Sequence, residues 1–400
     1  MRALILTNEF PPTIYGGAGV HVDELARHLR PLVELDIRTF GSQAAAEPGW
    51  RVRGYPPAHD LSATDDRLRP MLAALSRDLA MVADRVDADV VHAHTWYTHL
   101  GGLLARLSYG IPLVLTVHSL EPLRPWKREQ LGGGYEVSSW VERTALESAD
   151  AVVAVSRETR EDVLRLFDIP QERVHVIHNG IDADFYHPDP GTDALERHGV
   201  DRSVPYVLFV GRITRQKGIV HLVRAIEHLD PGIGVVLCAG QPDTPEIAEE
   251  MKRGVAAARA SREHVVWIGE MVSREEARQL YSHAAVFCCP SVYEPFGIIN
   301  LEAAACETPV VASAVGGIPE VVVDGETGLL VPVELRPDDP MSPVDPDRFE
   351  RNLAGAINAL MADAATREVM GRAGRRRAVE RFSWSRIAAE TVDLYRSLVR

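Results

Sequence analysis

Two glutamates, Glu294 and Glu302, bracket the stretch EPFGIINLE and are the first candidates for chemistry in this chain. An apolar run typical of a strand precedes the stretch and a helical pattern follows it. Gly297, Ile298 and Ile299 are therefore expected near a helix start, where free backbone N–H groups attract anions. Glu294 falls on the preceding loop and Glu302 inside the helix, so the pair suits hydroxyls on two parts of one ligand better than an acid–base couple. The alternative is that both glutamates only keep an amphipathic helix soluble.

A second motif, VGRITRQKG at 210–218, places two cations after another strand-like run. Arg212 and Lys217 are five residues apart, and Gly211 and Gly218 flank them. Two cations at the end of a strand can hold a diphosphate and neutralise the charge that grows on it as it leaves. A solvated basic turn is the alternative.

A third motif, YGGAG at 15–19, lies between the first strand-like run and a helical pattern. Gly16 and Gly17 permit a close approach of the backbone, and the helix start behind them offers N–H groups to an anion. No Gly-Lys-Ser/Thr follows, so the motif is not a P-loop. Alone it is a weak signal, because many strand-to-helix turns contain glycines.

Histidines follow two further strand-like runs. His118 opens the loop HSLEPLRPWKREQLGGG, which is long enough to close over a substrate, although a lone histidine is usually structural. His92 and His94 in HAHTWYTH share one strand face and could bind a metal. No carboxylate or cysteine stands at a matching spacing, so a substrate-facing loop carrying Tyr97 and His99 is preferred. The Asp-Ala-Asp triplets at 87–89 and 182–184 do not fall at strand C-terminal ends, and no metal site is expected.

The elements that must position these residues form two series. Six strand-like runs alternate with helical patterns before residue 180, and six more do so between 206 and 333. We therefore predict an α/β protein with two doubly wound, Rossmann-like parallel sheets, whose ligand-binding edges face each other across a cleft. The expected boundaries are 1–179 for the first domain with a returning helix at 384–400, 180–204 for a linker, and 205–383 for the second domain.

Composition narrows the functional class. The chain has 400 residues and a formal net charge of −14, which argues against a general nucleic-acid or anionic-membrane binder. The four cysteines show no metal-ligand spacing; Cys288 and Cys289 are expected to be buried strand thiols. No apolar run approaches the roughly 20 residues of a membrane span, and the N-terminus reads as a strand. A cytoplasmic protein is expected.

In this order the Gly-Gly turn, GRITRQKG and EPFGIINLE followed by GGIPE resemble the retaining glycosyltransferases of family four, which have the GT-B fold. The resemblance spans nearly the whole chain. The stretches NEFPPTIYGGAGVHV, HAHTWYTHL and 118–156 further resemble the actinobacterial glycogen synthases of this family, regarded as α-maltose-1-phosphate synthases. The resemblance implies ADP-glucose as donor, with UDP-glucose less expected, and glucose 1-phosphate or an α-1,4-glucan end as acceptor.

The resemblance also implies roles for individual residues. Arg212 and Lys217 would bind the donor diphosphate, Glu294 the hexose hydroxyls and Glu302 the ribose. The remaining donor contacts would come from His118, Gly16, Gly17, Gly211, Gly240, Met271, Phe296, Gly297, Ile298 and Ile299. Catalysis would be the task of His118, Arg212, Lys217 and Glu294, with no cofactor, and the acceptor would be bound by Glu9, Tyr15, Tyr97, His99, Arg124 and Lys127.

The acceptor phosphate has its own hypothesis. Arg124, Lys127 or Arg128 on the basic loop after His118 would bind it, unless these cations only pair with Glu121 and Glu129. In this family the anomeric configuration is retained without an identified protein nucleophile, and the leaving diphosphate is taken to help deprotonate the acceptor.

The chain departs from the larger starch and glycogen synthases at two positions. They carry Lys-Thr-Gly-Gly at the first turn, where this chain has Ile14, Tyr15, Gly16 and Gly17, and they stack an aromatic ring on adenine where this chain has Glu270. Open alternatives are a glucan-only synthase, a family-four enzyme with an acceptor such as inositol phosphate, a nucleotide-sugar epimerase and a non-catalytic binder. A homodimer is a family-level expectation only.

Overall fold

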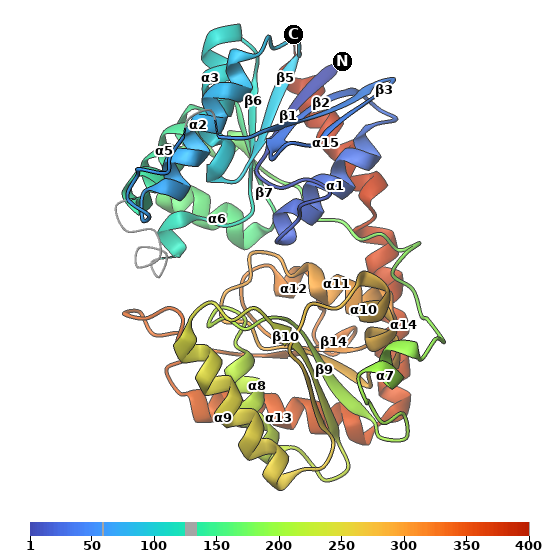
Figure 1. The fold of residues 1–400 in the computed structure, drawn as a ribbon. Helices are drawn as coiled ribbons and strands as arrows, with labels where there is room; N and C mark the ends of the chain where they lie inside the picture. Colours follow the sequence, from blue (N-terminus) through green and yellow to red (C-terminus); the bar gives the residue numbers. More distant parts are fainter. Residues whose placement is uncertain (58–59, 125–133, 400) are drawn as a thin grey trace. The chain divides into compact units, whose positions relative to one another are not determined.

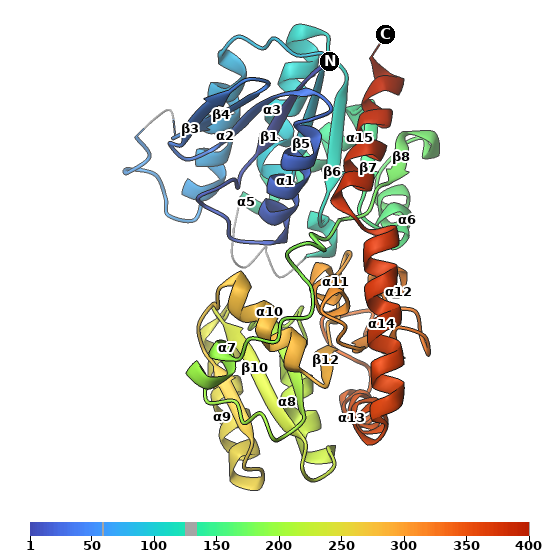
Figure 2. The same cartoon turned by 90° about the vertical axis from the view of Figure 1, so that its right-hand side faces the viewer.

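The chain divides into two compact units, which we describe separately. The computed structural model describes residues 1–57, 60–124 and 134–399. The first unit comprises Met1–Gly180 together with the segment from Trp384 to the C-terminal end, and the second unit is Ile181–Ser383. Figures 1 and 2 show the elements of each unit in two views.

The first unit is built on an eight-stranded sheet with the order β3-β4-β2-β1-β5-β6-β7-β8. All neighbouring strands are parallel except β3, which is antiparallel to β4. The strands are β1 (Arg2–Thr7), β2 (Glu34–Phe40), β3 (Ala44–Glu47), β4 (Trp50–Tyr55), β5 (Val90–His94), β6 (Leu113–Val117), β7 (Ala151–Ala154) and β8 (Val174–Val176). The helices are α1 (Gly17–Leu29), α2 (Arg69–Ala83), α3 (Trp96–Tyr109), α5 (Gly134–Ser148), α6 (Arg157–Leu166) and α15 (Trp384–Leu398), with short 3-10 turns η1 (Glu121–Leu123) and η2 (Gln171–Arg173).

Helices cover both faces of this sheet, as the continuous apolar run of β1 requires. Ala3 and Ile5 pack with residues of α1 and α15, whereas Leu4 and Leu6 pack with residues of α2, α3, α5 and α6. Successive side chains of a strand point to opposite faces, so a run such as RALILT must be apolar throughout. The C-terminal helix α15 therefore completes one face of the N-terminal sheet, beside α1 (Figure 1).

The second unit is built on a six-stranded parallel sheet with the order β11-β10-β9-β12-β13-β14. Its strands are β9 (Tyr206–Arg212), β10 (Gly234–Gly240), β11 (Val265–Ile268), β12 (Val286–Cys289), β13 (Val310–Ser313) and β14 (Gly328–Val331). Its helices are α7 (Asp193–Arg197), α8 (Ile219–Ala225), α9 (Pro245–Ser261), α10 (Arg274–His283), α11 (Ile298–Ala305), α12 (Ile318–Val321), α13 (Pro346–Ala362) and α14 (Ala364–Arg381), with a 3-10 turn η3 (Ile226–His228). Sequential strands alternate with helices, and the order reverses beside β9, which is the doubly wound pattern.

The fold class is confirmed, and all twelve expected strands are present. Two strands, β3 and β4, were not anticipated: β3 is entirely exposed and β4 alternates charged with apolar residues, so neither gives a continuous apolar run. Residues 181–204, assigned to a linker from the sequence, pack on the second unit. Asp189 pairs with Arg278, and the amide of Ala194 donates to Gln279.

Buried thiols and helix lengths complete the description. Cys288 and Cys289 lie in β12 and are buried, as predicted, and Cys238 and Cys306 are buried free thiols as well. Within 1–57, 60–124 and 134–399, no helix combines the length and apolar character needed to cross a bilayer.

Candidate active site

An ion pair between Lys217 and Glu294 lies at the centre of the second unit's site. Lys217 Nζ is 2.6 Å from Glu294 Oε2, and the hydroxyl of Ser291 donates to the same oxygen. Lys217 follows β9 and Glu294 follows β12, which are neighbouring parallel strands, so their carboxyl ends reach the same edge. Burial disfavours the charged lysine, but the charge of Glu294 and its hydrogen bond outweigh this and raise the pKa of Lys217. Lys217 is therefore charged at neutral pH.

Two glycines fix the backbone beneath this pair. Gly218 (φ 62°) leaves no room for a side chain, because an added Cβ would lie 1.9 Å from the carbonyl oxygen of Pro290. Gly316 (φ 55°) stands in the same relation to the carbonyl oxygen of Glu294, again at 1.9 Å. The amide of Gly317 donates to that oxygen at 3.0 Å. The GGIPE motif thus holds the backbone of Glu294, a role that its sequence does not reveal.

Arg212, the other predicted cation, ends β9 and is bound to a carboxylate. Its Nη1 lies 2.9 Å from Asp243 Oδ1, and both side chains are partly exposed. Arg212 is close enough to Lys217 for its charge to lower the pKa of that lysine slightly. Arg212 and Lys217 are therefore neighbours, as the spacing predicted, whereas Arg215, the third cation of GRITRQKG, pairs with Glu250.

Helix α11 begins beside the ion pair. Gly297 precedes its first residue with φ 95°, and no side chain caps the amides that follow, among them those of Ile298 and Ile299. The aromatic ring of Phe296 is buried against Phe382 at 5.8 Å, so only its backbone is available to a ligand. The start of α11 can thus offer backbone N–H groups to an anion next to Lys217.

Glu302 lies within α11 and is bound by aromatic hydroxyls. The hydroxyl of Tyr281 donates to Glu302 Oε2 at 3.0 Å. Burial raises the pKa of Glu302, although this hydrogen bond and one with Tyr186 oppose the shift. Sequence reasoning did not identify either tyrosine, because both come from other segments of the chain.

Met271 and Gly240, two of the predicted donor contacts, lie at the same edge of the sheet. Met271 follows β11, and its side chain is 61% exposed. Gly240 ends β10, and an added Cβ there would lie 3.0 Å from the carbonyl oxygen of Gly269. Close packing of these two loops explains the glycine at 240.

In the first unit, the Gly-Gly turn already holds an anion supplied by the chain. The carboxylate of Glu9 accepts from the amides of Tyr15 at 2.8 Å and Gly16 at 2.9 Å. A Cβ at Gly16 would meet nothing within 4 Å, so the turn is open on that side. Sequence reasoning listed Glu9 as an acceptor contact but missed its bond to the turn.

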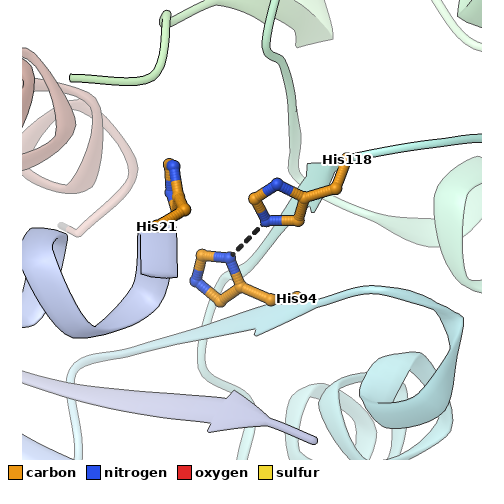
Figure 3. A group of neighbouring side chains, drawn as sticks. All are labelled: His21, His94 and His118. Atoms are coloured by element: carbon orange, nitrogen blue, oxygen red, sulfur yellow. Dashed lines mark hydrogen bonds between the residues drawn. The ribbon is translucent and has the colours of Figure 1, made fainter. Parts of the chain in front are cut away.

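His118 follows β6 and stands among buried histidines (Figure 3). Its Nε2 lies 3.2 Å from Nδ1 of His94, the last residue of β5, and its ring is 4.7 Å from the ring of His21 in α1. Burial and the neighbouring imidazoles lower the pKa of His118 well below its usual range. Its ring is therefore neutral at physiological pH.

Two of the other predicted acceptor residues lie in a helix, whereas a loop was expected. Tyr97 and His99 lie in the first turn of α3, not on a loop, and His99 is only 1% exposed. Tyr97 stacks on Trp96 at 4.3 Å, and burial together with the charge of Glu121 raises the pKa of its hydroxyl. The loop prediction failed because HAHTWYTH contains no helix-start signal other than Thr95.

Arg124 lies at the end of η1, near Tyr97. Its Nη1 is 3.2 Å from the hydroxyl of Ser119 and 3.8 Å from a carboxylate oxygen of Glu121, which is a long ion pair. Lys127 and Arg128 lie outside the described residues.

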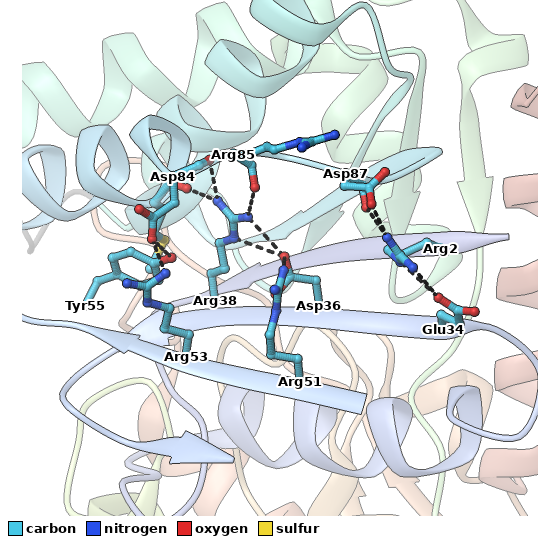
Figure 4. Close-up of polar contacts among 11 residues, drawn as sticks. Arg2, Glu34, Asp36, Arg38, Arg51, Arg53, Tyr55, Asp84, Arg85 and Asp87 are labelled. Atoms are coloured by element: carbon cyan, nitrogen blue, oxygen red, sulfur yellow. Dashed lines mark hydrogen bonds and ion pairs between the residues drawn. The ribbon is translucent and has the colours of Figure 1, made fainter. Parts of the chain in front are cut away.

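Arginines and aspartates of the first unit form a network of polar contacts (Figure 4), and the network lines two cavities. Their volumes are about 180 and about 510 Å³, and arginines and aspartates line them, including Arg38, Asp36 and Arg51. Burial opposes the ionisation of Asp36, but the two arginines lower its pKa overall. The second cavity is lined by Arg2, Glu34 and Trp50, which begin their strands, whereas ligands of such sheets bind at the strand C-terminal ends. We take this network to be structural.

The two doubly wound units and the matches to family models define a glycosyltransferase of the GT-B class. Residues 15–185 match the family model described as Glycosyltransferase Family 4, and residues 192–377 match the one described as Glycosyl transferases group 1. The sucrose-phosphate synthase of Thermosynechococcus elongatus has a similar structure, with a TM-score of 0.80 and 27% identity, covering 100% of this chain and 99% of that one.

Curated relatives establish the family directly. The chain is 51% identical over 406 residues to an α-maltose-1-phosphate synthase of Mycolicibacterium smegmatis, with 100% of both chains covered. It is 34% identical to a D-inositol 3-phosphate glycosyltransferase of Xylanimonas cellulosilytica, covering 95% of this chain and 91% of the relative. The chain therefore belongs to glycosyltransferase family 4 and is a hexosyltransferase.

Gly316 offers a test of how the Glu294 backbone is held. We expect Gly316→Ala to destabilise the protein by about 1–3 kcal/mol more than Gly325→Ala, because only the first adds a Cβ against a carbonyl oxygen. Both glycines have positive φ, so the backbone strain is common to the two variants. Urea unfolding measures the difference. Equal losses would mean that the Glu294 loop can move away, and that Gly316 does not fix it.

Proposed function

We propose that this enzyme transfers glucose from ADP-glucose to glucose 1-phosphate, forming α-maltose 1-phosphate, or to the end of an α-1,4-glucan. The observation that carries the proposal is the 51% identity with an α-maltose-1-phosphate synthase over the whole of both chains. The paired site residues of GRITRQKG and EPFGIINLE support the donor half of the reaction. On this proposal the protein acts in α-glucan synthesis in the cytoplasm.

Lys217, Arg212 and the start of α11 are assigned to the donor diphosphate. Two cations and a set of uncapped amides at one sheet edge match a group that gains negative charge as it leaves. Lys217 is already ordered by Glu294, so little further ordering is needed when the diphosphate arrives. Gly16 and Gly17 are assigned to the same phosphates from the first unit's motif.

The glutamates are assigned to recognition. Glu294 would accept hydrogen bonds from hexose hydroxyls while keeping Lys217 as its counter-ion, and Glu302 would accept from the ribose. The hydroxyls of Tyr281 and Tyr186 hydrogen-bond Glu302 and would hold its carboxylate in place for the ribose. The exposed loop at Met271 would border the base, and His118 would contact the hexose.

The bond changes then follow from retention of configuration. The bond between the anomeric carbon and the diphosphate oxygen breaks, and the acceptor hydroxyl oxygen bonds to that carbon on the same face. The acceptor proton passes to the departing diphosphate oxygen, so no protein nucleophile is required. Lys217 and Arg212 stabilise the charge on the leaving group, and the site acts by positioning and electrostatics.

Incubation with each donor and acceptor tests the proposal. ADP-glucose or UDP-glucose is paired with glucose 1-phosphate, maltose, glycogen or D-inositol 3-phosphate, and the products are identified by mass. We expect a disaccharide monophosphate from ADP-glucose and glucose 1-phosphate. Transfer to D-inositol 3-phosphate alone would favour the activity of the Xylanimonas relative, a D-inositol 3-phosphate glycosyltransferase. Elongation of glucan alone would favour a glucan synthase. If ADP is released and no acceptor becomes glucosylated, each of these transferase functions is contradicted.

Removal of either member of the central ion pair should abolish most turnover. We expect Lys217→Ala and Glu294→Gln to lower kcat by about 10²–10³-fold, because each removes a group aimed at the donor. Lys252→Ala is the matched control, since Lys252 forms an exposed pair with Glu249 in α9. Circular dichroism confirms folding of each variant. Unchanged turnover in a folded Lys217 or Glu294 variant would refute the site assignment.

The acceptor phosphate is assigned to Arg124, with Lys127 and Arg128. Replacing all three by alanine should raise the KM for glucose 1-phosphate about tenfold or more, because a charged hydrogen bond is lost. The KM for maltose, which carries no phosphate, should stay unchanged. Arg351→Ala, an exposed arginine of α13, controls for the loss of positive charge. An unaltered KM for glucose 1-phosphate would exclude this assignment.

A further inference from the structure

Three histidines from separate elements converge in the first unit (Figure 3). His21 comes from α1, His94 from the end of β5 and His118 from the residue after β6. One ring nitrogen from each lies within 4.8 Å of the other two. His21 and His94 are buried and His118 is partly exposed, so the cluster has one accessible member.

The spacing of these nitrogens resembles that of metal ligands. His94 Nδ1 and His118 Nε2 are 3.2 Å apart. A tetrahedral ion with metal–nitrogen bonds of about 2.0–2.1 Å separates its ligands by roughly 3.3 Å. An ion could therefore replace the proton that these two rings share, with a small movement of His21 to complete the set.

Hydrogen bonds to the cluster leave a suitable nitrogen free. Asn179 Oδ1 lies 2.6 Å from His21 Nδ1 and fixes the orientation of that ring. His21 Nε2 is buried and has no hydrogen-bond partner in the described structure. Metal-bound histidines commonly make such a bond through the other ring nitrogen.

The protonation state also favours an ion. Burial lowers the pKa of His21 to about 4, against a smaller opposing effect of Asn179, and it lowers the pKa values of His94 and His118 well below their usual range. Histidine binds metals through a neutral ring, so protons do not compete at pH 7. His92 is not available, because Tyr395 and Thr116 occupy both of its nitrogens.

We propose that His21, His94 and His118 form a binding site for one divalent transition-metal ion, with Zn²⁺ as the natural candidate. Three imidazoles suit zinc, and they leave a fourth position for water. Resting on the proposed function, the consequence is inhibition, because an ion held by His118 takes that ring away from the donor hexose. The competing explanation is a purely hydrogen-bonded core of neutral histidines.

Metal titration of the full chain, without sugar nucleotide, tests the site. Zn²⁺ binding is followed by calorimetry and Co²⁺ binding by visible absorption, so the result does not depend on catalysis. We expect one ion per chain with the absorption of a four-coordinate cobalt site bound by nitrogen and oxygen. His21→Gln and His118→Gln should each weaken binding about tenfold or more.

A histidine of the same helix supplies the control. His28→Gln removes a second histidine of α1, which hydrogen-bonds the carbonyl of Glu24 away from the cluster, and should bind as the unaltered protein does. Thermal unfolding checks that each variant folds. If the His21 variant does not fold, the variant at the partly exposed His118 still tests the site. The proposal fails if the unaltered chain binds no ion stoichiometrically, or if the folded His118 variant binds equally well.

Discussion

The ion pair between Lys217 and Glu294 is the contact on which the second unit's site depends. Its partners come from loops after adjacent strands, and the loops are joined through backbone contacts that leave no room for side chains at Gly218 and Gly316. Val292 also donates its amide to the carbonyl of Gln216, between the two loops. The ion pair is thereby ordered by folding itself, which spares a ligand the entropic cost of ordering two long side chains.

The sequence alone predicted the features that depend on residues close together along the chain. Each expected strand is present because a parallel strand covered on both faces must be apolar throughout, as in β10. Glu294, Lys217 and Arg212 were found because each follows such a run within a few residues. Residues that meet across the sheet, such as Gly316 and Glu294, share no spacing that a single sequence reveals. Strand β4, which lies beside the edge strand β3, was missed for the opposite reason, since its exposed positions permit arginines within the strand.

The first unit's turn illustrates the same limit. Its glycines predicted an anion at the start of α1, and the structure supplies one from the chain, the carboxylate of Glu9. A carboxylate binds there because uncompensated amides at a helix start favour negative charge, and the predicted phosphate contact stays a prediction. A phosphate that used the amides of Tyr15 and Gly16 would have to displace Glu9. Such a ligand would have to bind these amides more strongly than the carboxylate of Glu9 does.

The buried histidine cluster also bears on the anomeric carbon at which the proposed reaction takes place. His92 and His94 alone gave little reason to expect an ion, since the third and fourth rings come from α1 and from the end of β6. Their mutual burial keeps His118 neutral. In the proposed reaction the anomeric carbon gains positive charge as the diphosphate departs, and a cationic ring beside it would oppose that step. A neutral imidazole can instead exchange hydrogen bonds with the hexose at no electrostatic cost, so the environment that would admit a metal ion also suits the sugar.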